Sequence, residues 1–347
     1  MNSYNRPAES SARLPAVVLV LSLLLTVRAQ ATGESATVPS RLQAAAPAAS
    51  FRIHNFMRDF WRFWAAARGR AVTIQMRLWQ ELYVKPHQAV FEDLARPCKD
   101  EFAPTWARTH YFPNLPKIVP GMHEAAAGLP EKLSAARTRF LQAFPDMSWT
   151  GDVYIMASGY CFNGRAQSVQ GHEAILFGID TRVALGQKDP APDMTHELFH
   201  RYHSRFFDFK PSSGYPLWTT LWAEGMAEFV AETLNPTASD ADLSLVPIGM
   251  PRQVDARRKE LAADFLEKFT ATDDEDAKKW FNDTNSKDPV VPARAGYELG
   301  VLVVQELAKR HSIQVMAHWS RSQAEPRIAA ALASIAHGAP RIQEPSS

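Results

Sequence analysis

Residues 193–200 of this chain read Asp193-Met194-Thr195-His196-Glu197-Leu198-Phe199-His200. The two histidines are four residues apart, so on a helix their side chains lie on one face, about one turn from each other. Imidazole rings placed in this way reach a single Zn²⁺ ion at about 2.0–2.1 Å. Glu197 follows the first histidine directly and projects toward the same cavity. A carboxylate at that position can take a proton from a zinc-activated water.

The flanking residues predict that this stretch is helical. Pro192 is a favourable residue at a helix start, and the Asp193 side chain is suited to cap N–H groups of the first turn. Apolar residues then recur at Leu198, Phe199, Tyr202, Phe206 and Phe207. The alternative is a structural helix that carries the HExxH pattern by chance, on the order of one time in a hundred for a chain of this length.

A second predicted helix, residues 218–234, carries two further acidic groups. It contains Trp222-Ala223-Glu224-Gly225-Met226-Ala227-Glu228-Phe229. Glu224 and Glu228 are four residues apart and share an apolar face, so their carboxylates point partly inward. Carboxylates on such a face need a partner or a metal ion. A catalytic zinc site also needs a third protein ligand beside an open position. The alternative is a pair of solvated helix glutamates.

Taken together, HELFH and the later WAEGMAEF resemble the gluzincin metallopeptidases of the thermolysin and aminopeptidase type. The motifs that carry this resemblance lie between about residues 150 and 300. It implies one Zn²⁺ per chain, with His196, His200 and Glu224 as the ligands. It also implies that Glu228 is the carboxylate that orients a ligand histidine and raises its basicity.

The resemblance extends to other parts of the site. The run Ala174-Ile175-Leu176-Phe177-Gly178-Ile179-Asp180 is similar to the strand ahead of HExxH in predicted exported bacterial zinc-dependent proteases. In such enzymes this is an edge strand that binds an extended peptide by strand addition. A later helix supplies a side chain that stabilises the oxyanion, and Tyr297 or Arg294 is the best match here. The alternative for Tyr297 is an ordinary core residue.

Patterns along the rest of the chain predict an α+β fold that is mostly helical. Residues 51–95 and 120–144 have helical apolar spacing. Residues 152–180 carry short β-prone runs, with Asn163-Gly164 as a hairpin signal, and predict a small antiparallel meander. We expect this sheet to lie over the two zinc-binding helices, as in zincin-like folds, with a helical C-terminal lobe closing the cleft.

Four regions follow from these patterns. Residues 1–31 are typical of a secretory signal peptide, because a basic start precedes a short apolar run and a small-residue cleavage site. Residues 32–50 are rich in Ala, Ser, Thr and Pro and predict a flexible linker. Residues 51–150 predict an N-terminal helical region. Residues 151–347 predict the zinc metallopeptidase region, with the hairpin sheet, both motif helices and the C-terminal lobe.

Composition restricts the partners. The 38 Lys and Arg residues nearly balance 37 Asp and Glu, giving a formal net charge of +1. This balance argues against nucleic acid as a partner, because nucleic acid selects a basic excess. The N-terminal apolar run is shorter than the roughly 20 residues that span a bilayer. We therefore expect an exported protein, periplasmic or secreted, with no stable membrane span after processing. A retained membrane anchor is the alternative.

The two cysteines, Cys98 and Cys161, would meet an oxidising compartment after export. One disulfide between them and two unpaired thiols are both compatible with the sequence.

The expected activity is hydrolysis of peptide bonds in a peptide or protein substrate, with Glu197 as the general base. The sequence indicates no particular oligomeric state. Two other interpretations stay open: an exported non-enzymatic binding protein on an inactive zincin fold, and a zinc amide hydrolase that acts on a non-protein substrate. An intact Glu197 argues against the binding protein, because this residue has no metal-holding role. Cys161 lacks the flanking motif of the peptide deformylases, which argues against that amide hydrolase.

Overall fold

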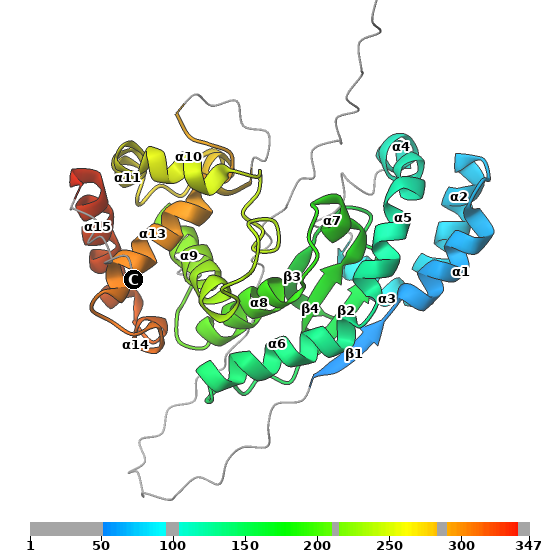
Figure 1. Cartoon of the computed structure of the whole chain (residues 1–347), viewed down its shortest axis with the longest axis horizontal. Coiled ribbons are helices and arrows are strands. Elements are labelled where there is room, and N and C mark those ends of the chain that lie inside the picture. Colours follow the sequence, from blue (N-terminus) through cyan, green and yellow to red (C-terminus); the bar gives the residue numbers. More distant parts are fainter. Residues whose placement is uncertain (1–50, 95–103, 210–214, 283–289, 339–347) are drawn as a thin grey trace, which may run out of the picture.

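A computed structural model of the chain describes residues 51–94, 104–209, 215–282 and 290–338. Helices make up most of it, around one small sheet. The N-terminal helices lie at one end of the molecule and the C-terminal helices at the other, with the sheet between them (Figure 1). The predicted signal peptide and linker, residues 1–50, lie outside the described residues.

The sheet is mixed. Its strands are β1 (Arg52–Asn55), β2 (Asp152–Met156), β3 (Gly164–Val169) and β4 (His172–Gly178), in the spatial order β1-β2-β4-β3. β1 is parallel to β2, β2 is parallel to β4, and β3 alone is antiparallel to its neighbour. The predicted antiparallel meander is therefore wrong. The helical prediction for residues 51–95 is also wrong at its start, where β1 joins the sheet.

Burial explains why β4 is central. Ala174 to Gly178 are all buried, whereas β3 alternates between buried and half-buried residues. A continuous apolar run is typical of a strand covered on both faces, and alternation is typical of a strand with one open face. The predicted edge strand was the segment that forms β4. The structure instead places β3 at the edge of the sheet.

The hairpin turn is also displaced from its predicted position. Val169 pairs with His172, so the turn is the two residues Gln170 and Gly171. Both have positive φ, 50° and 79°, as a type I′ turn requires. Asn163-Gly164 instead leads into β3, where the Asn163 carbonyl accepts a hydrogen bond from the N–H of Gly178.

The helical elements surround this sheet. Those before β2 in the chain are α1 (Met57–Ala67), α2 (Val72–Trp79), the π-helical η1 (Gln80–Val84), the 3₁₀ turn η2 (Lys85–His87), α3 (Gln88–Leu94), α4 (Pro104–Trp106), the π-helical η3 (Ala107–Tyr111), α5 (Phe112–Ala126) and α6 (Leu129–Ala143). Those after β4 are α7 (Ile179–Ala184), α8 (Ala191–His203), α9 (Leu217–Leu234), α10 (Met250–Ala256), α11 (Arg258–Glu267), α12 (Asp274–Ala277), the π-helical η4 (Lys278–Asn282), α13 (Ala295–Ala308), α14 (Ile313–Ala317) and α15 (Arg321–His337).

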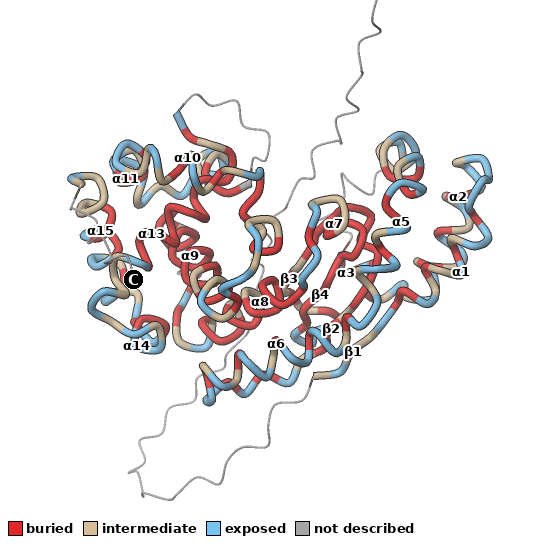
Figure 2. The backbone as a smooth tube through the Cα atoms, in the orientation of Figure 1, coloured by how far each residue is buried: buried red, intermediate tan, exposed pale blue. Residues whose placement is uncertain are grey.

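Burial concentrates on the helices that carry the motifs. The chain is buried along β2, most of β4 and much of α8, α9 and α13, whereas β1, α1, α2 and α11 expose much of their length (Figure 2). Every residue of α9 from 217 to 228 is buried. A helix buried around its whole circumference lies inside the fold, so its polar side chains need partners there.

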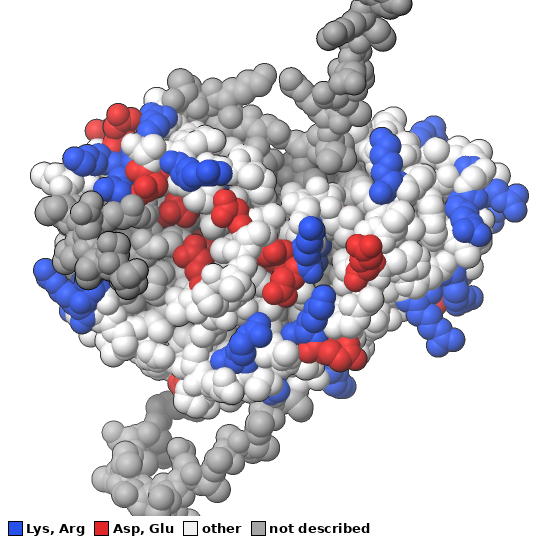
Figure 3. Space-filling view, in the orientation of Figure 1, with Lys and Arg blue, Asp and Glu red and all other residues white. Residues whose placement is uncertain are grey.

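Two surface properties bear on partners. On the face drawn in Figure 3, acidic and basic side chains of the described residues are interspersed rather than separated into large patches. Among the described residues, no helix has both the length and the apolar character needed to cross a bilayer.

α9 and α13 are in backbone contact where Gly225 and Gly300 meet. A Cβ atom added to Gly300 would lie 2.7 Å from the carbonyl oxygen of Leu221 and 2.8 Å from the Cα of Gly225. Backbone atoms cannot turn aside as a side chain can. The absence of a side chain at residue 300 is therefore what allows these two helices to approach so closely.

This contact predicts that Gly300→Ala destabilises the fold. Ala is intrinsically better in a helix than Gly, but here its methyl group must push two helices apart. We expect a net loss of about 1–3 kcal/mol in the free energy of unfolding, measured by denaturant titration. Gly121→Ala in α5 is the control, because its nearest neighbour is the Val183 side chain, which can move. Equal stability of the Gly300 and Gly121 variants would contradict this account.

Candidate metal centre

α8 and α9 pack together and bring the two motifs into one site. His196 and His200 lie one turn apart on α8, and Glu224 and Glu228 lie one turn apart on α9. His196 Nε2 is 2.9 Å from His200 Nε2 and 3.3 Å from Glu224 Oε2, which is 3.6 Å from His200 Nε2. Three side chains therefore offer one ligand atom each to a common point.

These separations match the metal that the sequence predicts. Ligand atoms at about 2.0–2.1 Å from a tetrahedral Zn²⁺ lie about 3.3–3.4 Å from one another. The observed 2.9, 3.3 and 3.6 Å bracket that value. Two imidazole nitrogens and one carboxylate oxygen are also a donor set that zinc accepts, with a fourth position left for water or substrate.

Glu228 holds the other side of one ligand ring. Its Oε2 lies 3.0 Å from His196 Nδ1. A carboxylate there accepts the Nδ1 proton, which leaves the Nε2 lone pair free to face Glu224 and His200. Glu228 is 1% exposed and does not belong to the convergent ligand set. This contact with His196 is the one that an orienting carboxylate would make.

The site attracts positive charge. Burial lowers the pKa of His196, but hydrogen bonds and negative charge from Glu224 and Glu228 outweigh this and raise the pKa well above its ordinary value. Burial raises the pKa of Glu224, but the two histidines outweigh it and lower the pKa. Two buried carboxylates beside two imidazoles thus favour a bound cation, either protons on the rings or a metal ion.

Glu197 lies between α8 and the edge strand. A Cβ atom built on Gly164 of β3 would be 3.5 Å from Glu197 Oε1, so this carboxylate lies near the strand's first residue. Glu197 is half-buried and is not one of the three convergent ligands. The Glu197 carboxylate is therefore not one of the three candidate metal ligands, although Glu197 directly follows His196 on α8.

Arg294 is the N-cap of α13, and Tyr297 lies in the first turn of this helix, three residues before Gly300. The Arg294 guanidinium stacks over the Tyr297 ring, 4.2 Å from its centroid, and Nη1 donates to the Ser244 carbonyl at 2.9 Å. Both residues are buried. Burial and then the negative charge of Glu224 raise the pKa of Tyr297, so its hydroxyl stays protonated. The close approach of α9 and α13 thus brings a phenol and a guanidinium toward the carboxylates of α9.

Two polar residues near the motif have roles that its spacing did not reveal. α8 begins at Ala191, so Asp193 lies inside the first turn rather than at the predicted cap position. Its carboxylate forms a buried ion pair with Arg182 and accepts a hydrogen bond from Ser244 Oγ at 2.9 Å. From the sequence, Asp193 was predicted only to cap the helix. No residue pattern around Ser244 indicated that its hydroxyl would donate to Asp193.

The cysteines are described only in part. Cys161 is fully buried and disulfide-bonded. Cys98, which the sequence offers as a possible partner, lies outside the described residues.

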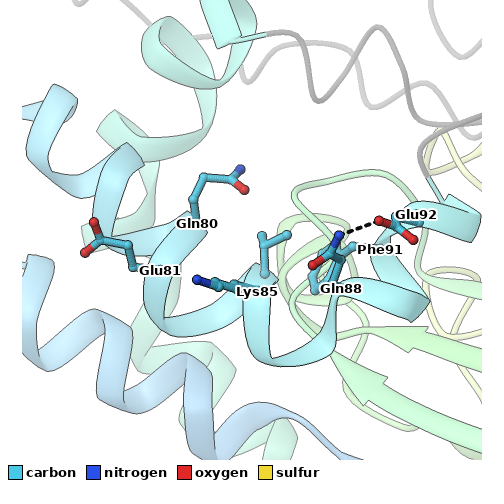
Figure 4. A pocket seen from close by; sticks show the side chains of 7 residues that line it. Gln80, Glu81, Lys85, Gln88, Phe91 and Glu92 are labelled. Carbon is cyan, nitrogen blue, oxygen red and sulfur yellow. Dashed lines mark hydrogen bonds between the residues drawn. The ribbon is translucent and has the colours of Figure 1, made fainter.

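A separate hollow of about 470 Å³ lies on the N-terminal helices. It is lined by side chains of η1, η2 and α3, drawn in Figure 4: Gln80, Glu81, Val84, Lys85, Gln88, Phe91 and Glu92. Most of these side chains are exposed, and the Gln88 amide donates to Glu92 at 2.5 Å. Polar groups that satisfy one another in solvent make a weaker candidate site than buried ligands that converge on one point.

No family model matches this chain, and no curated protein or solved structure matches it either. The case for the site therefore rests on its own geometry.

This geometry predicts one zinc ion per chain, measured by elemental analysis of protein purified without chelator. Glu224→Ala should lose the metal more completely than Glu228→Ala, because Glu224 supplies a ligand atom and Glu228 only orients a ring. Loss of an orienting group typically costs 10–100-fold in affinity or activity. Glu131→Ala, on the exposed face of α6, is the control. If Glu228→Ala lost more zinc than Glu224→Ala, the two roles would be exchanged.

Proposed function

We propose that this protein is an exported zinc-dependent peptidase of the gluzincin type. The observation that carries the proposal is the convergence of His196 Nε2, His200 Nε2 and Glu224 Oε2, at separations of 2.9 to 3.6 Å, beside an uncommitted Glu197. A site that only stored metal would not need a carboxylate next to the ligands and outside the ligand set.

The chemistry divides between the metal and the chain. His196, His200 and Glu224 would hold a zinc ion, which when bound would supply Lewis acidity and lower the pKa of a water to about 7. Glu197 would accept the proton of the attacking water and deliver it to the leaving amine. Glu228 keeps the His196 ring in the orientation and tautomer that ligation needs.

Charge that develops on the substrate carbonyl needs a donor on the opposite side. Tyr297 and Arg294 are the proposed donors, because Tyr297 lies within electrostatic reach of Glu224 and Arg294 within that of Glu228. The buried, protonated Tyr297 hydroxyl can donate a hydrogen bond, and Arg294 supplies positive charge. Fixed donors aimed at developing charge are typically the largest single contribution in such reactions.

A peptide is the proposed substrate because the site borders a sheet edge. β3 is the last strand of the sheet, and a Cβ atom built on its first residue, Gly164, would lie 3.5 Å from Glu197 Oε1. An extended peptide that added to β3 would run past the general base, bound by main-chain hydrogen bonds with little demand on its sequence. The sequence predicted this peptide-binding role for the segment that forms β4. We now propose it for β3, which lies at the sheet edge.

The proposed role of Glu197 predicts the effect of Glu197→Gln. Gln keeps the shape of the side chain but cannot accept the proton. The variant should fold normally and retain one zinc, yet cleave peptides roughly 10²–10⁴-fold more slowly than the wild type. The measurement is cleavage of a mixed peptide library read by mass spectrometry, with Glu131→Gln as the control.

The same experiment separates the alternatives. A zinc-loaded wild type that cleaves no peptide favours the binding protein or an amide hydrolase with another substrate. A Glu197→Gln variant that cleaves as fast as the wild type rules out the general-base mechanism, even with the metal site intact.

Export is proposed from the N-terminal segment alone. Ala29-Gln30-Ala31 is a small-residue cleavage site after a short apolar run. Mass spectrometry of the mature protein should place its N-terminus within a few residues of Thr32. An intact Met1 in the final compartment would identify a membrane anchor instead.

A further inference from the structure

The segment that connects α9 to α10, residues 235–249, reaches back to the start of β3 and to α8. Asn235 of this segment donates to Thr195 Oγ1 of α8 at 3.2 Å, and Ser244 contacts both regions. Its Oγ lies 2.8 Å from Asn163 Nδ2, 2.9 Å from Gln187 Nε2 and 2.9 Å from Asp193 Oδ1. The two amides can only donate and the carboxylate accepts, so the hydroxyl accepts two hydrogen bonds and donates one. That is its full capacity.

The backbone of Ser244 makes a contact in the other direction. Its carbonyl oxygen accepts a hydrogen bond from Arg294 Nη1 at 2.9 Å. Within the described part of the chain, Nε and Nη2 of Arg294 have no hydrogen-bond partner. The Ser244 carbonyl is thus a hydrogen-bond acceptor for this buried guanidinium, which also stacks on the Tyr297 ring.

The conformation of Ser244 is itself unfavourable. Its φ is 58°, in the left-handed region that residues with a side chain rarely adopt. Its neighbours Leu243 and Leu245 are buried. Two residues earlier, Asp242 accepts hydrogen bonds from the backbone N–H groups of Lys188 and Asp189, at 2.6 and 2.9 Å. The surrounding contacts thus enforce the strained backbone, which is typical of functional sites.

We infer that Ser244 is a positioning residue that joins the two sides of the metal centre. Its hydroxyl holds the side formed by α8 and the start of β3, and its carbonyl holds Arg294 and, through the stacked ring, Tyr297. Ser244 thus couples the position of the general base to that of the oxyanion donors, in addition to the packing of α8 and α13 against α9. The inference rests on the proposed function for its catalytic consequence but not for the contacts themselves.

The test compares Ser244→Ala, Ser244→Gly and Ser239→Ala. Ser239 is the matched control, because it lies in the same segment and its hydroxyl bonds only to Asp242 in that segment. Ala removes the Ser244 hydroxyl and keeps the unfavourable φ, whereas Gly removes the hydroxyl and relieves it. If Ser244 served only the local turn, Gly would be as good as Ser. We expect both variants to be impaired.

In kinetics on a cleaved peptide, Ser244→Ala and Ser244→Gly should lower kcat about tenfold with little change in KM and with zinc content unchanged. Ser239→Ala should match the wild type. In an Arg294→Ala background, Ser244→Ala should lower kcat less than twofold further, because its effect acts through Arg294. A kcat within twofold of wild type for Ser244→Ala, or an undiminished effect in the Arg294→Ala background, would overturn the inference.

A second readout needs no substrate. Backbone amide hydrogen exchange over the first turn of α13 should be about tenfold faster in Ser244→Ala than in Ser239→Ala. Equal exchange in the two variants would overturn the inference even if the wild type binds zinc and cleaves peptides. Faster exchange in a protein that binds no zinc would instead leave the contacts standing and refute the proposed function.

Discussion

The rest of the structure depends on one constraint, which is the burial of two carboxylates in α9. This helix is enclosed from residue 217 to 228, and within that span Glu224 and Glu228 are almost fully shielded from water. Buried carboxylates are costly unless they are paired and hydrogen-bonded. α8 supplies the pairing groups, His196 and His200, and so its position against α9 follows from charge as well as from apolar packing.

The same constraint explains which parts of the site the sequence could predict. The spacing of four residues in each motif places two side chains on one helix face, whatever the rest of the chain does. Local geometry therefore predicted that His196 and His200 converge, and that Glu224 and Glu228 both point inward. The structure confirms the helices, the convergence of His196, His200 and Glu224, and a hydrogen bond that Glu228 accepts from His196. The metal and the chemistry stay predictions.

The sheet could not be predicted in the same way, because strand pairing is set by contacts between distant residues. β1 pairs with β2 across about a hundred residues of chain, and nothing within Arg52–Asn55 announces that partner. Asn163-Gly164 has the composition of a hairpin turn, but Asn163 pairs with the end of β4 and the chain turns later, at Gln170-Gly171. The run of β4 was identified as a strand correctly. Its continuous burial places it at the centre of a mixed sheet rather than at an edge.

Ser244 illustrates a wider division between residues that react and residues that position them. The candidate reacting groups lie on helices, where the helical period allows the sequence to predict which side chains share a face. The residue that joins the two sides of the site sits in a connection, where placement depends on Asn163, Gln187 and Arg294 together. A serine with positive φ has no local signature, since its conformation is enforced by tertiary contacts. The distance between the two sides of the candidate site therefore depends on tertiary contacts across the fold, whereas its candidate ligands can be identified from the spacing within each motif.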